Sequence, residues 1–140
     1  MPDKKSVLFV CTGNSARSQM AEGLLRHAGA DSYCVSSAGT HPTYVRPEAA
    51  AVMKEVGIDI SGHRSKSVDQ FVGRQFDYVI TVCDNAKKTC PMFPGMAERL
   101  HWSFEDPAAL EGSDEQRRAA FRKVRDEIRA RISGFLSTTR

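Results

Sequence analysis

The chain has 140 residues, of which 41% are hydrophobic and 26% charged, and its formal net charge is +3. This composition is typical of one globular domain, so we expect a single domain over residues 1–140. We also expect a cytoplasmic protein with no membrane partner, because no apolar run approaches the ~20 residues of a membrane span and the N-terminus lacks a secretion signal.

Apolar runs alternate with helical patterns along the chain. Strands are expected at residues 6–11, 32–39, 76–83 and 99–104. Helices are expected over 16–29, ended by Gly29, over 47–57, between Pro47 and Gly57, and over 113–136, capped by Ser113. This alternation predicts an α/β fold with a four-stranded parallel sheet and helices on both faces.

Basic residues crowd late in the chain, in the segment RRAAFRKVRDEIRARISGFL. An apolar stripe at three- and four-residue steps runs through this segment: Phe121, Val124, Ile128, Ile132 and Phe135. We therefore interpret the basic residues as the solvated face of an amphipathic helix. No aromatic platform or nucleic-acid-binding motif accompanies the charge, so we expect a monomer with no nucleic-acid partner.

Two of the four cysteines are the last residues of expected strands: Cys11 ends the first strand and Cys83 ends the third. The carboxyl ends of parallel strands share one edge of the sheet, where ligands bind, so we expect both thiols at one site. Cytoplasmic thiols stay reduced, which favours catalytic, redox or metal-binding roles over structural disulfides. Cys34, inside the second expected strand, is interpreted as a small core residue.

Residues 11–18 read CTGNSARS and join the first strand to the first helix. The backbone amides of such a loop and the positive end of the helix can surround a tetrahedral oxyanion. Gly13 and Asn14 tolerate the left-handed backbone that such a loop needs, and Arg17 is a bidentate hydrogen-bond donor. Together with the Ser18 hydroxyl, these features predict a lowered pKa for the Cys11 thiol. The expected oxyanion-binding residues are Thr12, Gly13, Asn14, Ser15, Ala16, Arg17 and Ser18.

The stretch CTGNSARSQMAEG resembles the low-molecular-weight tyrosine phosphatase fold family, and especially the arsenate reductases of that fold that are recycled by thioredoxin. The resemblance continues through SAGT, MKEVGIDIS, the pair at 83 and 90, HWSFEDPA and FRKVRDEI. It implies that Cys11 is the nucleophile and that Arg17 binds the oxyanion, with Asn14 and Ser18 in support. Many family members have a second cysteine before this arginine, whereas this chain has Ala16.

An acid is expected in the sequence EDP at residues 105–107. Asp106 precedes Pro107 and is therefore held extended, which can direct its carboxyl group into a cleft. The family places its general acid in this Asp-Pro pair, so the resemblance assigns that role to Asp106. Glu105 is the rival, but neighbouring side chains in an extended segment point in opposite directions.

The segment CDNAKKTC holds Cys83 and Cys90. Zinc is disfavoured because neither Cys34 nor the four scattered histidines supply a second closely spaced pair, and we predict no metal site. A permanent disulfide is incompatible with a helical segment, because seven helical residues span ~10.5 Å and bridged Cα atoms lie roughly 4.4–6.8 Å apart. We therefore predict a redox pair whose segment rearranges on oxidation.

The predicted function is arsenate reduction by a relay of Cys11, Cys83 and Cys90, with thioredoxin as reductant and no cofactor. A first alternative is a phosphatase acting on phosphomonoesters, although Ala108 and Ala109 replace the aromatic that usually follows the Asp-Pro pair in that group. Weak phosphatase activity is expected in either case, because phosphate and sulfate are analogues of arsenate. A second alternative is a noncatalytic oxyanion-binding module.

Some family members bind potassium beside the loop through Asn, Glu, Ser and Asp side chains. Asn14, Glu22 and Ser37 match that pattern, but the position of the Asp is occupied by Lys66. An ammonium group there would stand where the cation sits, so the resemblance implies activity that is indifferent to potassium. The neighbouring His63 and Arg64 are interpreted as surface residues.

Overall fold

The computed structural model describes residues 4–83, 86 and 97–139. Its strands form one parallel sheet in the order β2-β1-β3-β4: β1 (Lys5–Cys11), β2 (Tyr33–Gly39), β3 (Tyr78–Thr81) and β4 (Glu98–His101). The described α-helices are α1 (Arg17–Gly29), α2 (Pro47–Glu55) and α4 (Asp114–Thr139), and two short 3₁₀ helices are η1 (Val68–Gln70) and η2 (Pro107–Ala109).

The sheet is built around β1, whose apolar run VLFV is fully buried. It pairs with β2 and with β3, so that Val7 lies beside Val35 on one side and Tyr78 on the other. A strand buried on both faces explains the unbroken apolar run, which replaces the alternation of a half-exposed strand. Because β1 is central, the residues that follow it emerge in the middle of the sheet edge.

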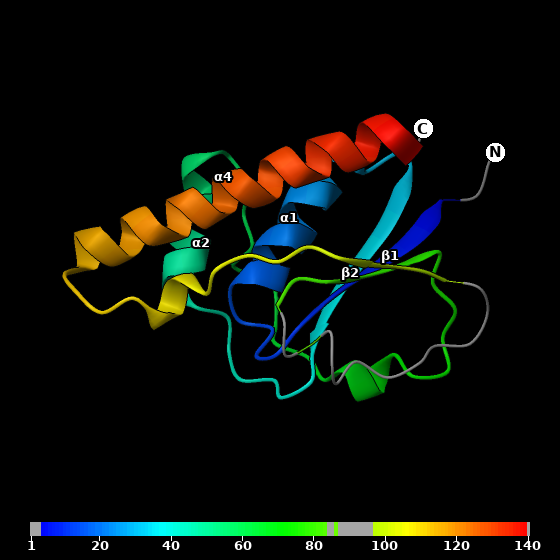
Figure 1. Ribbon diagram of the computed structural model, residues 1–140, viewed down its shortest axis with the longest axis horizontal. Coiled ribbons are helices and arrows are strands. Elements are labelled where there is room, and N and C mark those ends of the chain that lie inside the picture. The colour runs from blue at the N-terminus through cyan, green and yellow to red at the C-terminus, as the bar shows by residue number, and fades with distance from the viewer. Residues whose placement is uncertain (1–3, 84–85, 87–96, 140) are drawn as a thin grey trace.

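The helices form layers against this sheet. Figure 1 shows α1, α2 and α4 gathered on one side of the strands, with η1 on the other side. Phe135 of α4 packs at ring-centroid distances of 5.6 Å from Tyr33, 5.0 Å from Tyr78 and 5.7 Å from Trp102. The predicted α/β fold with a four-stranded parallel sheet and helices is confirmed, and among the described residues the three α-helices lie on one side while the short η1 lies on the other (Figure 1).

The helix boundaries follow the expected signals. Gly57 has a φ of 79°, and its N–H and that of Ile58 bond to the carbonyls of Lys54 and Met53, which closes the end of α2. The Ser113 hydroxyl accepts a bond from the N–H of Gln116 at 3.1 Å, and the N–H of Ser113 donates to Oε1 of Gln116 at 2.8 Å, so α4 begins as predicted. None of the described helices is long and apolar enough to span a membrane.

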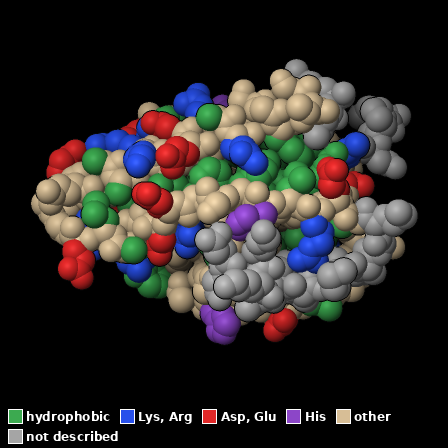
Figure 2. Space-filling model, viewed as in Figure 1, with side chains coloured by type: hydrophobic (Ala, Val, Ile, Leu, Met, Phe, Trp, Pro, Cys, Tyr) green, Lys and Arg blue, Asp and Glu red, His purple; other side chains and the backbone are tan. Residues whose placement is uncertain are grey.

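One interpretation of surface and core is wrong, and a second is incomplete. Cys34 is exposed, because β2 is an edge strand and Cys34 points away from the α1 side that buries Tyr33 and Val35. The basic residues of α4 are also more than a solvated face, since Arg122 and Arg125 both bond to Glu55 of α2. Figure 2 shows positive and negative side chains interspersed along this part of the surface.

Candidate active site

The oxyanion loop (residues 11–18) is held from outside by the segment at residues 40–46. Four backbone carbonyls of the loop accept hydrogen bonds from backbone N–H groups of this segment. The donor–acceptor pairs and their N···O distances are Thr40 and Cys11 at 3.1 Å, His41 and Thr12 at 2.8 Å, Thr43 and Gly13 at 3.0 Å, and Arg46 and Ser15 at 2.9 Å. On the inner side, the backbone N–H groups of Asn14 and Ser18 bond to the sulfur of Cys11. This is the arrangement that anion-binding backbone nests require.

The inner side of the loop depends on backbone that few residues adopt. Asn14 has a φ of 47°, as the sequence predicts for a loop of this curvature. Gly39, at the end of β2, lies directly behind the loop, and a Cβ atom there would be 2.5 Å from the carbonyl oxygen of Thr12 and 2.9 Å from the nitrogen of Asn14. The loop can therefore pack against β2 only because residue 39 has no side chain.

Cys11 lies at the floor of the loop and is only 2% exposed. Its Sγ is 2.8 Å from the Ser18 hydroxyl and accepts a bond from the N–H of Asn14 at 3.2 Å. Helix α1 starts beside it with Ala16 in the N-cap position and no side-chain cap, and the Ser18 N–H in its first turn bonds to the Cys11 sulfur. The predicted nucleophile therefore lies among donors that stabilise negative charge.

The pKa of Cys11 is nevertheless raised above its ordinary value, and the prediction of a lowered pKa is wrong. Burial of the thiol is the largest influence and raises the pKa. The hydrogen bonds of Ser18 and the charge of Arg17 act downward, as predicted, but do not outweigh it, and the nearby Cys83 raises the pKa further. The sequence identifies the donors around the sulfur but gives no measure of its burial.

Alkylation of Cys11 tests this direction. We expect its rate with iodoacetamide, followed at Cys11 by peptide mass spectrometry, to reach half its maximum at a higher pH than a free thiol of pKa about 8.5. Ser18→Ala should shift that midpoint upward again, because it removes a bond that lowers the pKa. A midpoint below that of the free thiol would contradict the dominance of burial.

Arg17, the first residue of α1, connects the oxyanion loop to the loop that follows β4. Its Nη1 donates to the carbonyl of Phe104 at 3.1 Å, and its Nη2 lies 3.9 Å from Oδ2 of Asp106. Two residues that the sequence placed in one site, Arg17 and Asp106, are thus neighbours although they are far apart in the chain. The carboxyl group of Asp106 lies next to the guanidinium at the start of α1.

Asp106 has the extended backbone expected before proline, with φ −79° and ψ 106°. Its Oδ1 accepts the N–H of Ala108 at 3.0 Å and caps η2, and its side chain is 45% exposed. Glu105 points elsewhere, since it is 82% exposed and lies 3.9 Å from the ammonium of Lys123 on α4. Of the two carboxylates, only Asp106 contacts the candidate site through Arg17.

Cys83 is a buried free thiol beside the oxyanion loop. It lies two residues beyond β3, which ends at Thr81 instead of at Cys83 as expected. Its Sγ is 3.3 Å from the hydroxyl of Thr12, the residue that follows Cys11. The thiols at the ends of β1 and β3 therefore meet at one edge of the sheet, while the predicted Cys90 lies outside the described residues.

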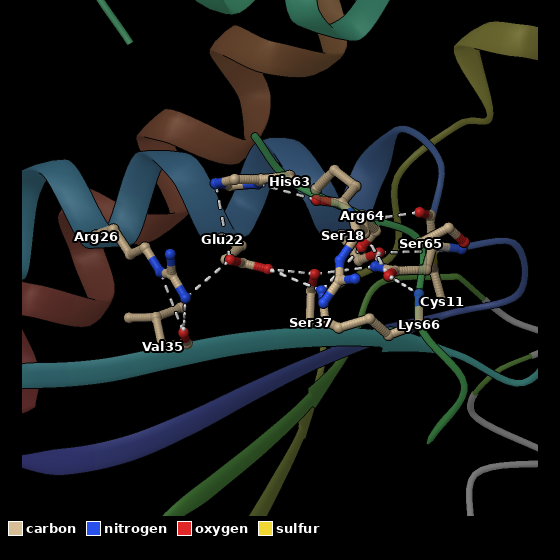
Figure 3. Close-up of polar contacts among 12 residues, drawn as sticks. Cys11, Ser18, Glu22, Arg26, Val35, Ser37, His63, Arg64, Ser65 and Lys66 are labelled. Carbon is tan, nitrogen blue, oxygen red and sulfur yellow. Dashed lines mark hydrogen bonds and ion pairs between the residues drawn. The ribbon is translucent and has the colours of Figure 1, made fainter. Parts of the chain in front are cut away.

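A polar cluster supports the loop from the far side (Figure 3). The side-chain amide of Asn14 donates to Ser18 at 2.8 Å and to Ser37 at 2.9 Å, and Ser37 donates in turn to the buried carboxylate of Glu22. Two cationic side chains and one imidazole approach that carboxylate: Arg26 at 3.1 Å, Lys66 at 3.8 Å and His63 at 3.8 Å (Figure 3). The interpretation of His63 as a surface residue is therefore wrong, because it packs against this cluster.

The described residues do not fit a potassium ion at this place. The ammonium of Lys66 lies 3.8 Å from Glu22 and donates to the carbonyl of Arg64 at 2.9 Å, so a positive charge already faces the carboxylate. An added cation would meet this charge and that of Arg26, which lies 3.1 Å from the same carboxylate. We therefore expect the same turnover rate in potassium and sodium chloride at equal ionic strength, and strong stimulation by potassium would contradict this.

A buried cysteine in a strand-to-helix loop of a parallel sheet, with backbone N–H groups directed at its sulfur, is the arrangement of phosphatase-like α/β proteins. Residues 6–140 match the family described as low molecular weight phosphotyrosine protein phosphatase. The chain belongs to this family, and its phosphatase-like fold is confirmed.

Individual relatives cover nearly the whole chain. An arsenate reductase of Halalkalibacterium halodurans is 48% identical over 97% of this chain and 98% of its own length. A solved arsenate reductase in the phosphate binding state is 36% identical, with a TM-score of 0.79 and coverage of 97% of this chain and 99% of that one. A thioredoxin-dependent arsenate reductase of Corynebacterium glutamicum is 34% identical, with a TM-score of 0.73, and covers 96% of this chain and 61% of that one.

Proposed function

We propose that this protein is an arsenate reductase that uses Cys11 as nucleophile, passes the oxidation to Cys83 and Cys90, and is recycled by thioredoxin. The observation that carries the proposal is the second buried thiol, Cys83, placed against the loop that holds the first. Ester hydrolysis needs one thiol, an arginine and an acid, whereas reduction needs a further thiol within reach. The names of the curated relatives support the same choice.

In the first step, burial keeps the proton on Cys11 until an oxyanion arrives. A bound arsenate dianion takes that proton and leaves a thiolate under the amides of the loop and the side chain of Arg17. The thiolate attacks arsenic and forms an S–As bond, and one As–O bond breaks. Asp106 gives its carboxyl proton to the departing hydroxide, which leaves as water.

In the second step, Cys83 as a thiolate attacks the sulfur of Cys11. The S–As bond breaks with its electron pair on arsenic, which is thereby reduced from the pentavalent to the trivalent state and leaves as arsenite. Cys90 then attacks Cys83, which frees Cys11 and leaves a Cys83–Cys90 disulfide. Thioredoxin, a dithiol reductant, opens this disulfide by exchange and becomes oxidised itself.

Arsenite formation with thioredoxin, thioredoxin reductase and NADPH tests this proposal. We expect multiple turnover for the wild type and for Cys34→Ser, a matched control that removes an exposed thiol. Cys83→Ser should yield no arsenite. Cys90→Ser should stop after one equivalent and accumulate a Cys11–Cys83 disulfide that mass spectrometry detects.

Full multiple turnover by both Cys83→Ser and Cys90→Ser would overturn the relay. Phosphate release from p-nitrophenyl phosphate, measured on the same proteins, separates the alternatives. A wild type that releases phosphate quickly and forms no arsenite is a phosphatase. A wild type that binds phosphate and forms neither product is a noncatalytic binding module.

A further inference from the structure

Gln19 is fully buried in the first turns of α1, directly behind the oxyanion loop. Its side-chain nitrogen Nε2 donates to three oxygens: the backbone carbonyl of Asn14 at 3.2 Å, Oδ1 of Asn14 at 3.0 Å and the carbonyl of Arg64 at 2.9 Å. Its oxygen Oε1 lies 3.0 Å from Nδ1 of His63. Gln19 therefore joins the left-handed residue of the loop to the segment that carries His63.

The partners of Gln19 decide the orientation of its amide group. Two of the three atoms near Nε2 are backbone carbonyl oxygens, which only accept hydrogen bonds, so the NH₂ group must face them. Its Oε1 then faces Nδ1 of His63 and can only accept. His63 must therefore carry a hydrogen on Nδ1 and donate it to Gln19, which fixes the tautomer of the neutral imidazole.

The turn that carries His63 is itself tightly placed. Ile60 is buried against α1 at Gly23, where an added Cβ atom would come within 2.8 Å of the Ile60 side chain. The carbonyl of Ile60 accepts the N–H of His63 at 3.0 Å, and Asp59 accepts the N–H of Ser61 at 2.8 Å. Because Gly23 lies one helical turn after Gln19, this packing brings His63 over Gln19.

We propose that His63 is a positioning residue of the active site: its Nδ1–H locks the Gln19 amide, and Gln19 in turn holds Asn14 in the left-handed conformation that directs the Asn14 N–H at the Cys11 sulfur. Each connection is a hydrogen bond between buried or half-buried groups, and the path runs from His63 through Gln19 and Asn14 to Cys11. The inference deepens the proposed function and rests on the same oxyanion loop.

His63 has a second neighbour, which provides a rival explanation. Its Nε2 lies 3.8 Å from Oε2 of Glu22, a carboxylate that Lys66 and Arg26 also approach (Figure 3). Burial lowers the pKa of His63, and Glu22 acts against this. At about pH 8 the imidazole is therefore neutral, and measurements at that pH isolate the role of the Nδ1–H.

Two substitutions separate the two nitrogens of the imidazole. In His63→Asn the side-chain amide nitrogen takes the place of Nδ1 and can still donate to Gln19, whereas in His63→Gln the amide reaches the place of Nε2, next to Glu22. His63→Ala removes both groups, and His27→Ala, at an exposed position of α1, is the matched control. Inorganic phosphate affinity, measured by calorimetry, and the alkylation rate of Cys11 provide the readouts.

We expect His63→Ala to weaken phosphate binding and slow Cys11 alkylation by about tenfold each, because it leaves a buried acceptor without its donor. His63→Asn should restore both to near the wild-type values, and His63→Gln should not. A purely structural role predicts that both readouts follow the thermal unfolding temperature of each variant, so that result would overturn the proposal. Recovery in His63→Gln instead of His63→Asn would also overturn it, in favour of Glu22.

These readouts need neither thioredoxin nor arsenite formation. If the wild type binds phosphate but makes no arsenite, the proposed function fails while the role of His63 is still decided by the Asn and Gln variants. If the wild type reduces arsenate and His63→Ala leaves phosphate binding and alkylation unchanged, the role of His63 fails alone.

Discussion

Replacement of Cys11 by serine should abolish arsenite formation while leaving phosphate binding close to that of the wild type. The serine hydroxyl is not ionised in this environment and cannot form the S–As bond, so we expect a fall of at least about 10⁴-fold, in the range seen when an enzyme loses its nucleophile. Binding should survive because the amides of the oxyanion loop and Arg17 are unchanged. The measurement pairs arsenite assays with phosphate calorimetry.

The Cys34→Ser protein serves as the control for this experiment, since it loses a thiol that is remote from the loop and exposed. Retention of turnover by Cys11→Ser would show that another residue attacks the oxyanion. Loss of phosphate binding in Cys11→Ser, in a protein that remains folded, would show that the sulfur itself is required to form the oxyanion site.

Gly39→Ala should have the second largest effect. The added methyl group would meet the Thr12 carbonyl at 2.5 Å and the Asn14 nitrogen at 2.9 Å, and both are backbone atoms that move only if the oxyanion loop moves. Overpacking of this kind costs about 1–3 kcal/mol of stability. Displacing a reacting group by roughly 1 Å can also lower the rate about 100-fold.

Gly62→Ala is the matched control, because a Cβ atom there would contact nothing within 4 Å in the described part of the chain. Thermal unfolding, phosphate affinity and arsenite formation should change little in that variant. If Gly39→Ala also binds phosphate with wild-type affinity, the contact between the loop and β2 does not define the oxyanion site.

The sequence predicts the sheet and its helices well because their periodicities are local. The run VLFV identifies a strand buried on both faces. Gly57 marks a helix end through a backbone bond, and Ser113 marks a helix start through a bond that its hydroxyl accepts. The strand ends at Thr81 and His101 differ from expectation by two or three residues. The end of a strand depends on its hydrogen bonds to the neighbouring strands, which the sequence of one segment does not indicate.

The oxyanion loop is predictable for the same reason: its glycine, asparagine and arginine lie within eight consecutive residues. The supports of the loop are not local. The 40–46 segment contributes backbone N–H groups, which any non-proline residue supplies, so no residue type marks it. The contact between Gln19 and His63 joins positions 44 apart in sequence. It depends on the packing of Ile60 against Gly23, which the sequence does not indicate.

Two of the failed predictions illustrate errors of burial, and not of motif recognition. The donors around Cys11 predict a lowered pKa, yet the surrounding core reverses the direction. Cys34 has apolar neighbours in sequence, yet it is exposed because its strand lies at the sheet edge. The burial of each residue depends on the helices and strands that pack beside it. Those neighbours are set by the order of the strands in the sheet.

The four backbone bonds that fasten the outer side of the oxyanion loop to residues 40–46 have a consequence for selectivity. A loop whose shape is held by these bonds should accept any tetrahedral oxyanion of similar size, so we expect phosphate to compete with arsenate for the site without being reduced. Arsenate and phosphate would then be distinguished only at the reduction step of the proposed mechanism. Pentavalent arsenic can accept two electrons from a thiolate, whereas phosphate phosphorus cannot. We therefore expect cellular phosphate to slow detoxification without ever being reduced.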